Sequence, residues 1–159
     1  MEEGQLHYLG GIIDADGSIY VNVNKRDAAQ FGYYLRPMIQ VTGSTKDHHS
    51  TRHDLMRDLA EEMELKSHSQ RQKRSDVIHT TIAGVSALEL MELIRPYVRE
   101  KGEVIDIILD APWPRNRYGM NGQPEEEFRE CVKAREQVRE MNSASHTKYD
   151  RERLLEELD

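Results

Sequence analysis

The sequence has a single cysteine, Cys131, among its 159 residues. A lone cysteine excludes a disulfide within the chain and a zinc site built from cysteines, and it is compatible with a reducing compartment. No apolar run is long enough to span a membrane, and the N-terminal Met1-Glu2-Glu3-Gly4 does not resemble a signal peptide. We therefore expect no membrane partner, and a location in a prokaryotic cytoplasm or inside an organelle.

Proline is also scarce, and three of the five prolines lie in one stretch, residues 111–124, which we expect to be a loop. Elsewhere, apolar residues recur with the spacing of a helix or of a strand. We expect helices over 5–16, 52–64, 86–95, 98–110 and 125–141, with a last helix to Leu158, and strands over 18–26, 33–43, 65–73 and 76–82. Ser86 is the expected N-cap of its helix, and Pro37 is expected to interrupt its strand.

The order of these elements is α-β-β-α-β-β-α. Paired strands, as opposed to strictly alternating strands and helices, indicate an α+β fold with an antiparallel sheet. The length suits one domain, residues 1–159. Its core would span about 5–111, and a C-terminal helical extension would span about 124–159.

The net charge of −7 is unusual for a protein that binds nucleic acid, but the charge is unevenly distributed. The strand-like segments 18–46 and 65–82 contain eight Lys and Arg residues against two Asp residues. The helix-like segments carry the acidic excess. Since a local basic surface attracts phosphate whatever the total charge, the expected sheet is a candidate nucleic-acid surface.

The segment from Leu9 to Gly17, LGGIIDADG, places small residues and two acids in one helix. Asp16 falls in the last turn, where the negative end of the helix dipole disfavours a carboxylate by roughly 0.3–1 kcal/mol. An acid in this position suggests a compensating cation. Because glycine allows close backbone approach, two copies of the helix could meet and bring two carboxylates to one divalent metal ion.

This nonapeptide resembles the LAGLIDADG motif of homing endonucleases, with Gly10 for the usual alanine and Ile12 for leucine. The resemblance implies metal-dependent cleavage of double-stranded DNA at a long pseudo-palindromic site, with Mg²⁺ or Mn²⁺. It implies that Asp16 binds the metal and that the Ala15 carbonyl contributes. One motif per chain implies a homodimer. The expected interface is formed by Gly10, Gly11, Ile13 and Asp14, of which Asp14 alternatively caps a neighbouring element.

Weaker similarities to the single-motif branch of the family continue along the chain in the same order. The segment from Arg95 to Lys101, RPYVREK, resembles the one that supplies a catalytic lysine, which maps to Lys101. There are two departures from the family pattern: Gly43 replaces a common glutamine, and Asp47 replaces a basic residue. The resemblance implies that these positions order water near the metals. We expect that water network to depart from the family's, or Ser44, Thr45 or Lys46 to take over those roles.

Alternating side chains on a basic sheet suit base reading in the major groove, where Asn and Gln pair with adenine, Arg pairs with guanine, and apolar groups touch thymine methyls. Lys148 is instead a candidate phosphate contact. The expected DNA-binding residues are Tyr20, Asn22, Asn24, Arg26, Arg36, Met38, Gln40, Arg71, Lys73, Asp76, Ile78 and Lys148.

Other functions remain open at this stage. Asp14 and Asp16 also resemble the D-x-D opening of haloacid-dehalogenase-type phosphatases, but the paired strands and the lack of a Gly-Asp pair disfavour that fold. An EF-hand fails because Ile19 occupies the position that requires glycine. His49 and His53 have the spacing of a zinc pair on a helix. A cleavage-deficient DNA-binding protein and an intron RNA maturase are the remaining alternatives.

Overall fold

The computed structural model describes residues 2–44, 51–62, 64–71, 76–115, 122–142, 155–156 and 158. In order along the chain, the elements are α1 (Glu3–Asp16), β1 (Ser18–Lys25), β2 (Tyr33–Ser44), α2 (Thr51–Glu62), β3 (Ser67–Arg71), β4 (Val77–Ala83), α3 (Val85–Ile94), the 3₁₀ helix η1 (Arg95–Tyr97), α4 (Gly102–Asp110) and α5 (Glu125–Met141). The predicted α+β class and element order are confirmed. Most of the expected last helix lies outside the described residues.

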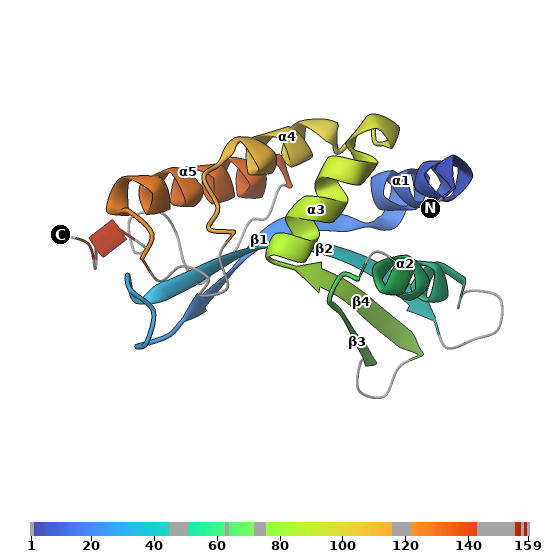
Figure 1. Cartoon of the computed structure of the whole chain (residues 1–159), viewed down its shortest axis with the longest axis horizontal. Coiled ribbons are helices and arrows are strands. Elements are labelled where there is room, and N and C mark those ends of the chain that lie inside the picture. Colours follow the sequence, from blue (N-terminus) through green and yellow to red (C-terminus); the bar gives the residue numbers. More distant parts are fainter. Residues whose placement is uncertain are drawn as a thin grey trace.

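The four strands form one antiparallel sheet in the order β1-β2-β4-β3. Helices cover one face of this sheet, and the opposite face is open (Figure 1). Strand alternation explains the division, because Ile19, Ile39, Val41 and Ile82 are buried under the helices whereas their neighbours point the other way. The sheet therefore has one apolar face for the core and one polar face free for a partner.

Pro37 does not interrupt β2, as the sequence had suggested. In a strand, the N–H and C=O of a residue point to the same side, and the Pro37 carbonyl accepts a hydrogen bond from the Gly84 N–H at 2.8 Å. The missing N–H of Pro37 therefore points to where β4 has already ended at Ala83. No ladder hydrogen bond is lost, and the strand continues.

The start of α3 also differs from the prediction. Gly84, not Ser86, is the N-cap residue. The Ser86 hydroxyl instead accepts a hydrogen bond from the Lys66 N–H at 3.2 Å, and this bond ties the start of α3 to the chain before β3.

The helix α5 is part of the hydrophobic core. Phe128, Cys131, Val132 and Val138 are at most 1 % exposed, and α5 packs on α4 and β1. At its C-terminal end the Asn142 side chain donates a hydrogen bond to the Ile19 carbonyl at 2.7 Å. The helix α5 and its C-cap Asn142 thus fix β1 on the helix-covered face of the sheet. Among the described helices, none combines the length and the apolar character needed to cross a membrane.

Candidate functional site

The C-terminal end of α1 is held by Lys101. Its ammonium group donates hydrogen bonds to the carbonyl oxygens of Ile13 and Asp14, both at 2.7 Å. These carbonyls belong to the negative end of the helix dipole, so the Lys101 ammonium stabilises that end. It also fixes the backbone that carries Asp16. The catalytic role assigned to Lys101 stays a prediction.

Asp14 is turned into its own protomer. Its two carboxylate oxygens accept hydrogen bonds from the backbone N–H groups of Arg99, at 2.6 Å, and Lys101, at 3.0 Å. Burial acts to raise the pKa of Asp14, but hydrogen bonds from the backbone of Arg99, Lys101 and Glu100, together with the charge of Lys101, hold that pKa below its ordinary value. Of the two roles considered for Asp14, the structure shows the cap.

Two other residues assigned to the dimer interface lie inside the protomer. Ile13 is 0 % exposed within the hydrophobic core. A Cβ atom at Gly10 would lie only 2.7 Å from the Tyr97 carbonyl oxygen. The missing side chain of Gly10 is therefore needed for α1 to pack against η1, and the assignment of Ile13 and Gly10 to a dimer interface is wrong.

The outward surface of α1 carries a different set of residues. A Cβ atom at Gly11 or Gly4 would meet nothing within 4 Å, and Tyr8 is 52 % exposed. With Ala15, which is also exposed, these residues recur at helical spacing along one line. We call Gly4, Tyr8, Gly11 and Ala15 the α1 stripe. Asp16 is the exposed residue that follows the stripe at the end of the helix.

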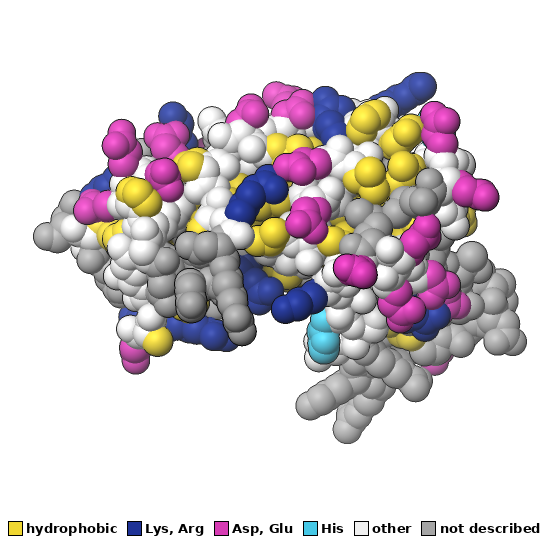
Figure 2. All heavy atoms as spheres, viewed as in Figure 1, with side chains coloured by type: hydrophobic (Ala, Val, Ile, Leu, Met, Phe, Trp, Pro, Cys, Tyr) yellow, Lys and Arg dark blue, Asp and Glu magenta, His cyan; other side chains and the backbone are white. Residues whose placement is uncertain are grey.

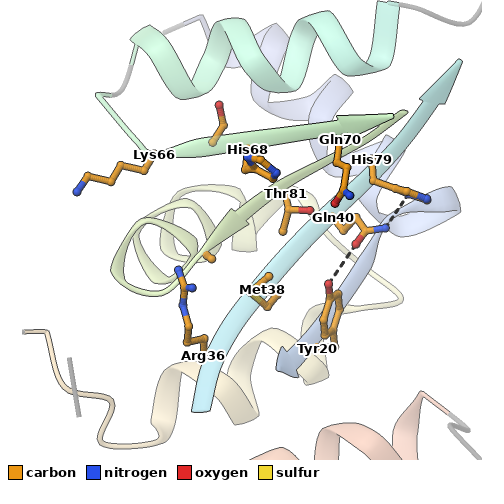
Figure 3. Close-up of a pocket in the computed structure, with 11 residues that line it drawn as sticks. Tyr20, Arg36, Met38, Gln40, Lys66, His68, Gln70, His79 and Thr81 are labelled. Atoms are coloured by element: carbon orange, nitrogen blue, oxygen red, sulfur yellow. Dashed lines mark hydrogen bonds between the residues drawn. The ribbon is translucent and has the colours of Figure 1, made fainter. Parts of the chain in front are cut away.

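The open face of the sheet is hollowed. A cavity of about 480 Å³ lies over β2, β3 and β4 (Figure 3), and it is lined by Tyr20, Arg36, Met38, Gln40, Lys66, Ser67, His68, Gln70, His79, Thr81 and Ala83. We call this cavity the sheet groove. Figure 2 shows Lys, Arg and His side chains at the hollow underside of the molecule, whereas Asp and Glu side chains spread over the helices. The uneven charge in the sequence is therefore also uneven in space.

Six of the predicted DNA-binding residues lie on this open face: Tyr20, Asn22, Asn24, Arg36, Met38 and Gln40. Arg26 follows β1 and stacks over the Tyr34 ring, with its guanidinium carbon 5.6 Å from the ring centre. Asp76 is exposed just before β4. The side chain of Arg71, and Lys73, Asp47, Lys148 and the proposed zinc histidines, lie outside what the structure describes.

Ile78 was predicted to touch thymine, and this is wrong. Ile78 lies two residues before the buried Thr80 and four before the buried Ile82, so its side chain is on the same, helix-facing side of the sheet. Ile78 is partly buried there and pairs with the buried Gly43.

The prediction also missed groove residues, above all His79 and Thr81 of β4 and His68 and Gln70 of β3. The same alternation would have found the first two, since they are the neighbours of Thr80 in sequence. For β3 there was no such signal, because SHSQR contains no apolar residue to mark its buried face.

Replacement of Asp14 by Asn tests the cap. One acceptor oxygen and the charge are lost, so we expect the free energy of unfolding at pH 7 to fall by about 1–3 kcal/mol. Because the folded-state pKa of Asp14 is lowered, its contribution is complete above the ordinary carboxylate pKa of about 3.9 and is lost as the pH falls through the folded value. Urea unfolding at one protein concentration should show the difference between the proteins shrinking below about pH 4.

Asp110→Asn is the matched control, since Asp110 is an exposed residue at the end of α4. Asp110→Asn should leave the unfolding free energy within about 0.5 kcal/mol of wild type, both at pH 7 and below about pH 4. Equal effects of the two substitutions would show that the cap does not contribute to stability.

The comparisons with known proteins agree with this geometry. The family model described as LAGLIDADG endonuclease matches residues 9–101. A comparison with curated protein sequences gives no match. Among solved structures, the homing endonuclease I-CvuI in complex with its target in the presence of calcium has a TM-score of 0.77 at 18 % identity, over 97 % of this chain and 92 % of that chain.

Two further structures are similar. The archaeal intron-encoded homing endonuclease I-Vdi141I, complexed with DNA, has a TM-score of 0.73 at 14 % identity, over 100 % of this chain and 97 % of that chain. The group I intron-encoded homing endonuclease I-CeuI, also complexed with DNA, has a TM-score of 0.66 at 15 % identity, over 95 % and 74 %. The structural likeness shows a shared fold, and the match of the family model over residues 9–101 shows that this chain belongs to the LAGLIDADG homing endonuclease family.

Proposed function

We propose that this chain is a site-specific endonuclease that acts as a homodimer and cuts double-stranded DNA at a long pseudo-palindromic site, with Mg²⁺ or Mn²⁺. The observation that carries the proposal is the place of Asp16. This exposed carboxylate ends a helix whose outward line is made of glycine, alanine and one tyrosine. The C-terminal end of α1 thus lies between the α1 stripe, which suits contact with a second copy, and the start of β1 in the open sheet.

The α1 stripe supports the dimer. Gly11 presents no side chain and meets nothing in its own protomer, so the backbone of a second α1 can approach closely. The exposed ring of Tyr8 offers apolar area beside it. Under twofold symmetry the same stripe faces itself, and the two Asp16 residues then lie near one axis.

The donor set fits a hard divalent cation. Carboxylate and carbonyl oxygens are the ligands that Mg²⁺ and Mn²⁺ prefer, and Asp16 and the Ala15 carbonyl provide them. The described part of one protomer contains no cluster of three or more Asp, Glu, His or Cys residues that could hold a metal ion. We therefore propose that Asp16 of each protomer contributes to a shared site.

When bound, the metal would activate water and stabilise the leaving oxygen of the phosphodiester. The protein's own residues provide position and charge. Lys101 fixes the last turn of α1, Asp14 fixes the backbone of Arg99 and Lys101, and both keep the Asp16 carboxylate at a defined point. The sheet groove, with Arg36 and Lys66 at its sides, would bind the duplex next to that point.

The similar structures support the substrate class. I-CvuI, I-Vdi141I and I-CeuI were each observed with DNA, and one I-CvuI structure in the presence of magnesium shows a DNA that is not cleaved. For this chain we propose double-stranded DNA as the substrate. A cleavage-deficient binding protein or an RNA maturase would share the fold. Measurements of DNA cleavage and of RNA binding distinguish these two alternatives from the proposed endonuclease.

The proposal is tested by selection from a library of randomised duplex DNA in the presence of Ca²⁺. We expect enrichment of one sequence with approximate twofold symmetry, because a symmetric dimer reads two half-sites. Enrichment of an asymmetric site, or of none, would contradict the homodimer that binds specific DNA. Preference for folded RNA over the selected duplex would favour the maturase.

Binding should weaken steeply with salt in spite of the net acidic charge, because cations in the sheet groove displace counterions from phosphates. Lys66→Gln should reduce the slope of log affinity against log salt concentration by about one for each protomer. Lys133→Gln, on the exposed surface of α5, is the control and should leave the slope unchanged. Titrations at several salt concentrations measure both, and equal slopes for all three proteins would remove Lys66 from the phosphate contacts.

A further inference from the structure

Four side chains on the open face of the sheet form a hydrogen-bonded chain across three strands. The Tyr20 hydroxyl on β1 donates to Gln40 Oε1 on β2 at 3.1 Å, and Gln40 Nε2 lies 2.8 Å from His79 Nδ1 on β4 (Figure 3). The Thr42 hydroxyl on β2 lies 3.0 Å from the same ring nitrogen. All four side chains are partly buried, so this chain of contacts is shielded from bulk water on one side.

The direction of each hydrogen bond follows from the chemistry of the groups. Burial raises the pKa of Tyr20, so its phenol stays protonated and donates. In the amide orientation of the structure, Gln40 Nε2 donates and His79 Nδ1 accepts, so a neutral imidazole carries its proton on Nε2. A reversed amide would instead need the proton on Nδ1, which would then donate to Oε1. The contact therefore couples the tautomer of His79 to the side of Gln40 on which the amide oxygen lies.

After these contacts, Gln40 keeps one acceptor lone pair on Oε1 and one N–H on Nε2. This remaining pair is complementary to the major-groove edge of adenine, which presents an N6 donor beside an N7 acceptor. Gln40 lines the sheet groove, where a duplex would lie under the proposed function. We infer that Gln40 reads one adenine in each half-site, and that His79 is a positioning residue that holds the Gln40 amide in the reading orientation.

The need for a positioning residue follows from the symmetry of the glutamine side chain. Rotation of the amide by half a turn exchanges Oε1 and Nε2, and the donor and acceptor then face the wrong atoms of adenine. The Tyr20 hydroxyl alone does not prevent this rotation, since it can donate to Oε1 or accept from Nε2. In the Nε2–H tautomer, His79 Nδ1 only accepts, so it tolerates the nitrogen of Gln40 and rejects the oxygen.

The inference rests on the proposed DNA-binding function, and one experiment separates the two. Wild type, Gln40→Ala and His79→Leu are each presented with the same library of randomised duplex DNA, in Ca²⁺, and the bound fractions are sequenced. Wild type should enrich an A·T pair at one symmetric position in each half-site. Gln40→Ala should lower that preference by roughly tenfold to a hundredfold, the value of a bidentate contact. His79→Leu should reduce the preference at the same position and leave the others unchanged.

Two further variants distinguish positioning from a merely structural effect. In His79→Asn, Oδ1 can take the place of Nδ1 as an acceptor, but the asparagine amide can also turn and donate. The adenine preference should therefore lie between that of His79→Leu and that of wild type. His68→Leu makes the same chemical change in the same groove, but His68 pairs in register with Thr81 and forms no hydrogen bond with Gln40. It should leave the preference at the Gln40 position unchanged.

The outcomes are distinct. A symmetric selected site whose A·T preference is unaffected by Gln40→Ala or His79→Leu would overturn the inference and leave the proposed function intact. Equal loss in His79→Leu and His79→Asn would also overturn it, because a lost acceptor would not be the cause. Failure of wild type to enrich any duplex would overturn both the inference and the proposed function.

Discussion

Replacement of Asp16 by Asn is expected to abolish DNA cleavage and to preserve specific DNA binding. The carboxylate supplies charge to the proposed metal, whereas the side chains of the sheet groove make most of the proposed contacts with DNA. Changes in the outer shell of a metal site already cost about 10- to 100-fold in activity, so loss of a ligand should lower the cleavage rate by more than about 100-fold. The affinity for the selected site in Ca²⁺ should stay within about threefold of wild type, a difference below 1 kcal/mol.

The same substitution should not harm the fold. Asp16 lies at the negative end of the α1 dipole, and a second Asp16 is expected nearby in the dimer, so removal of the charge relieves repulsion. Thermal unfolding should give a melting temperature equal to or above that of wild type. Asp110→Asn, the same change at the end of α4, is the control and should cleave at the wild-type rate. Cleavage by Asp16→Asn at a rate near wild type would show that Asp16 is not the metal ligand.

Replacement of Gly11 by Leu is expected to convert the proposed dimer into a monomer. Gly11 lies in the α1 stripe, and an added side chain meets nothing in its own protomer, so the clash arises only with a second copy. Leucine also has a helix propensity about 1 kcal/mol better than glycine, so α1 itself is not weakened. With only one half-site bound, affinity for the selected duplex should fall by at least about 100-fold, and double-strand cleavage should be lost.

Light scattering at micromolar concentration measures the oligomeric state directly. Lys133→Leu adds the same side chain to the exposed surface of α5 and should remain a dimer. A monomeric wild type, or a dimeric Gly11→Leu that still cuts, would contradict an interface on the α1 stripe.

The sequence was sufficient for the fold because the apolar pattern has a clear period. Alternation in 18–26 and helical spacing in 125–141 predicted β1 and α5 nearly to the residue, and both elements bury those apolar positions. Pro37 was misjudged because its effect depends on where the neighbouring strand ends, and that is a property of tertiary structure.

The site was predicted only in outline, because residue type does not determine direction. Gly10 and Gly11 are adjacent and chemically identical, yet one packs against Tyr97 and the other faces outward. Adjacent residues of a helix point about 100° apart around its axis, and sequence spacing alone did not show which of the two glycines faces Tyr97. Lys101 was recognised as important, but the carbonyls that it binds lie 87 and 88 residues earlier in the chain.

The contact of His79 with Gln40 was missed for a related reason, although alternation alone would have placed His79 on the open face. Its contribution comes from hydrogen bonds to Gln40 and Thr42 on another strand, and such contacts depend on the β2–β4 register, in which Thr42 pairs with His79. A histidine beside two threonines in sequence carries no signal of that register. Ile78, its neighbour, attracted the thymine assignment because the phase of β4 was read one residue out of step.

The central claim, that this protein cuts specific DNA with a metal held by Asp16, is tested most directly on a supercoiled plasmid that carries one copy of the selected site. The wild-type protein is incubated with this plasmid in Mg²⁺, and parallel samples contain Ca²⁺, chelator or a plasmid without the site. The proposal predicts a linear product with both ends inside the site in Mg²⁺, and intact plasmid in the other samples. A plasmid that stays supercoiled in Mg²⁺ while its site is saturated with protein would contradict the claim and identify a DNA-binding protein that does not cleave.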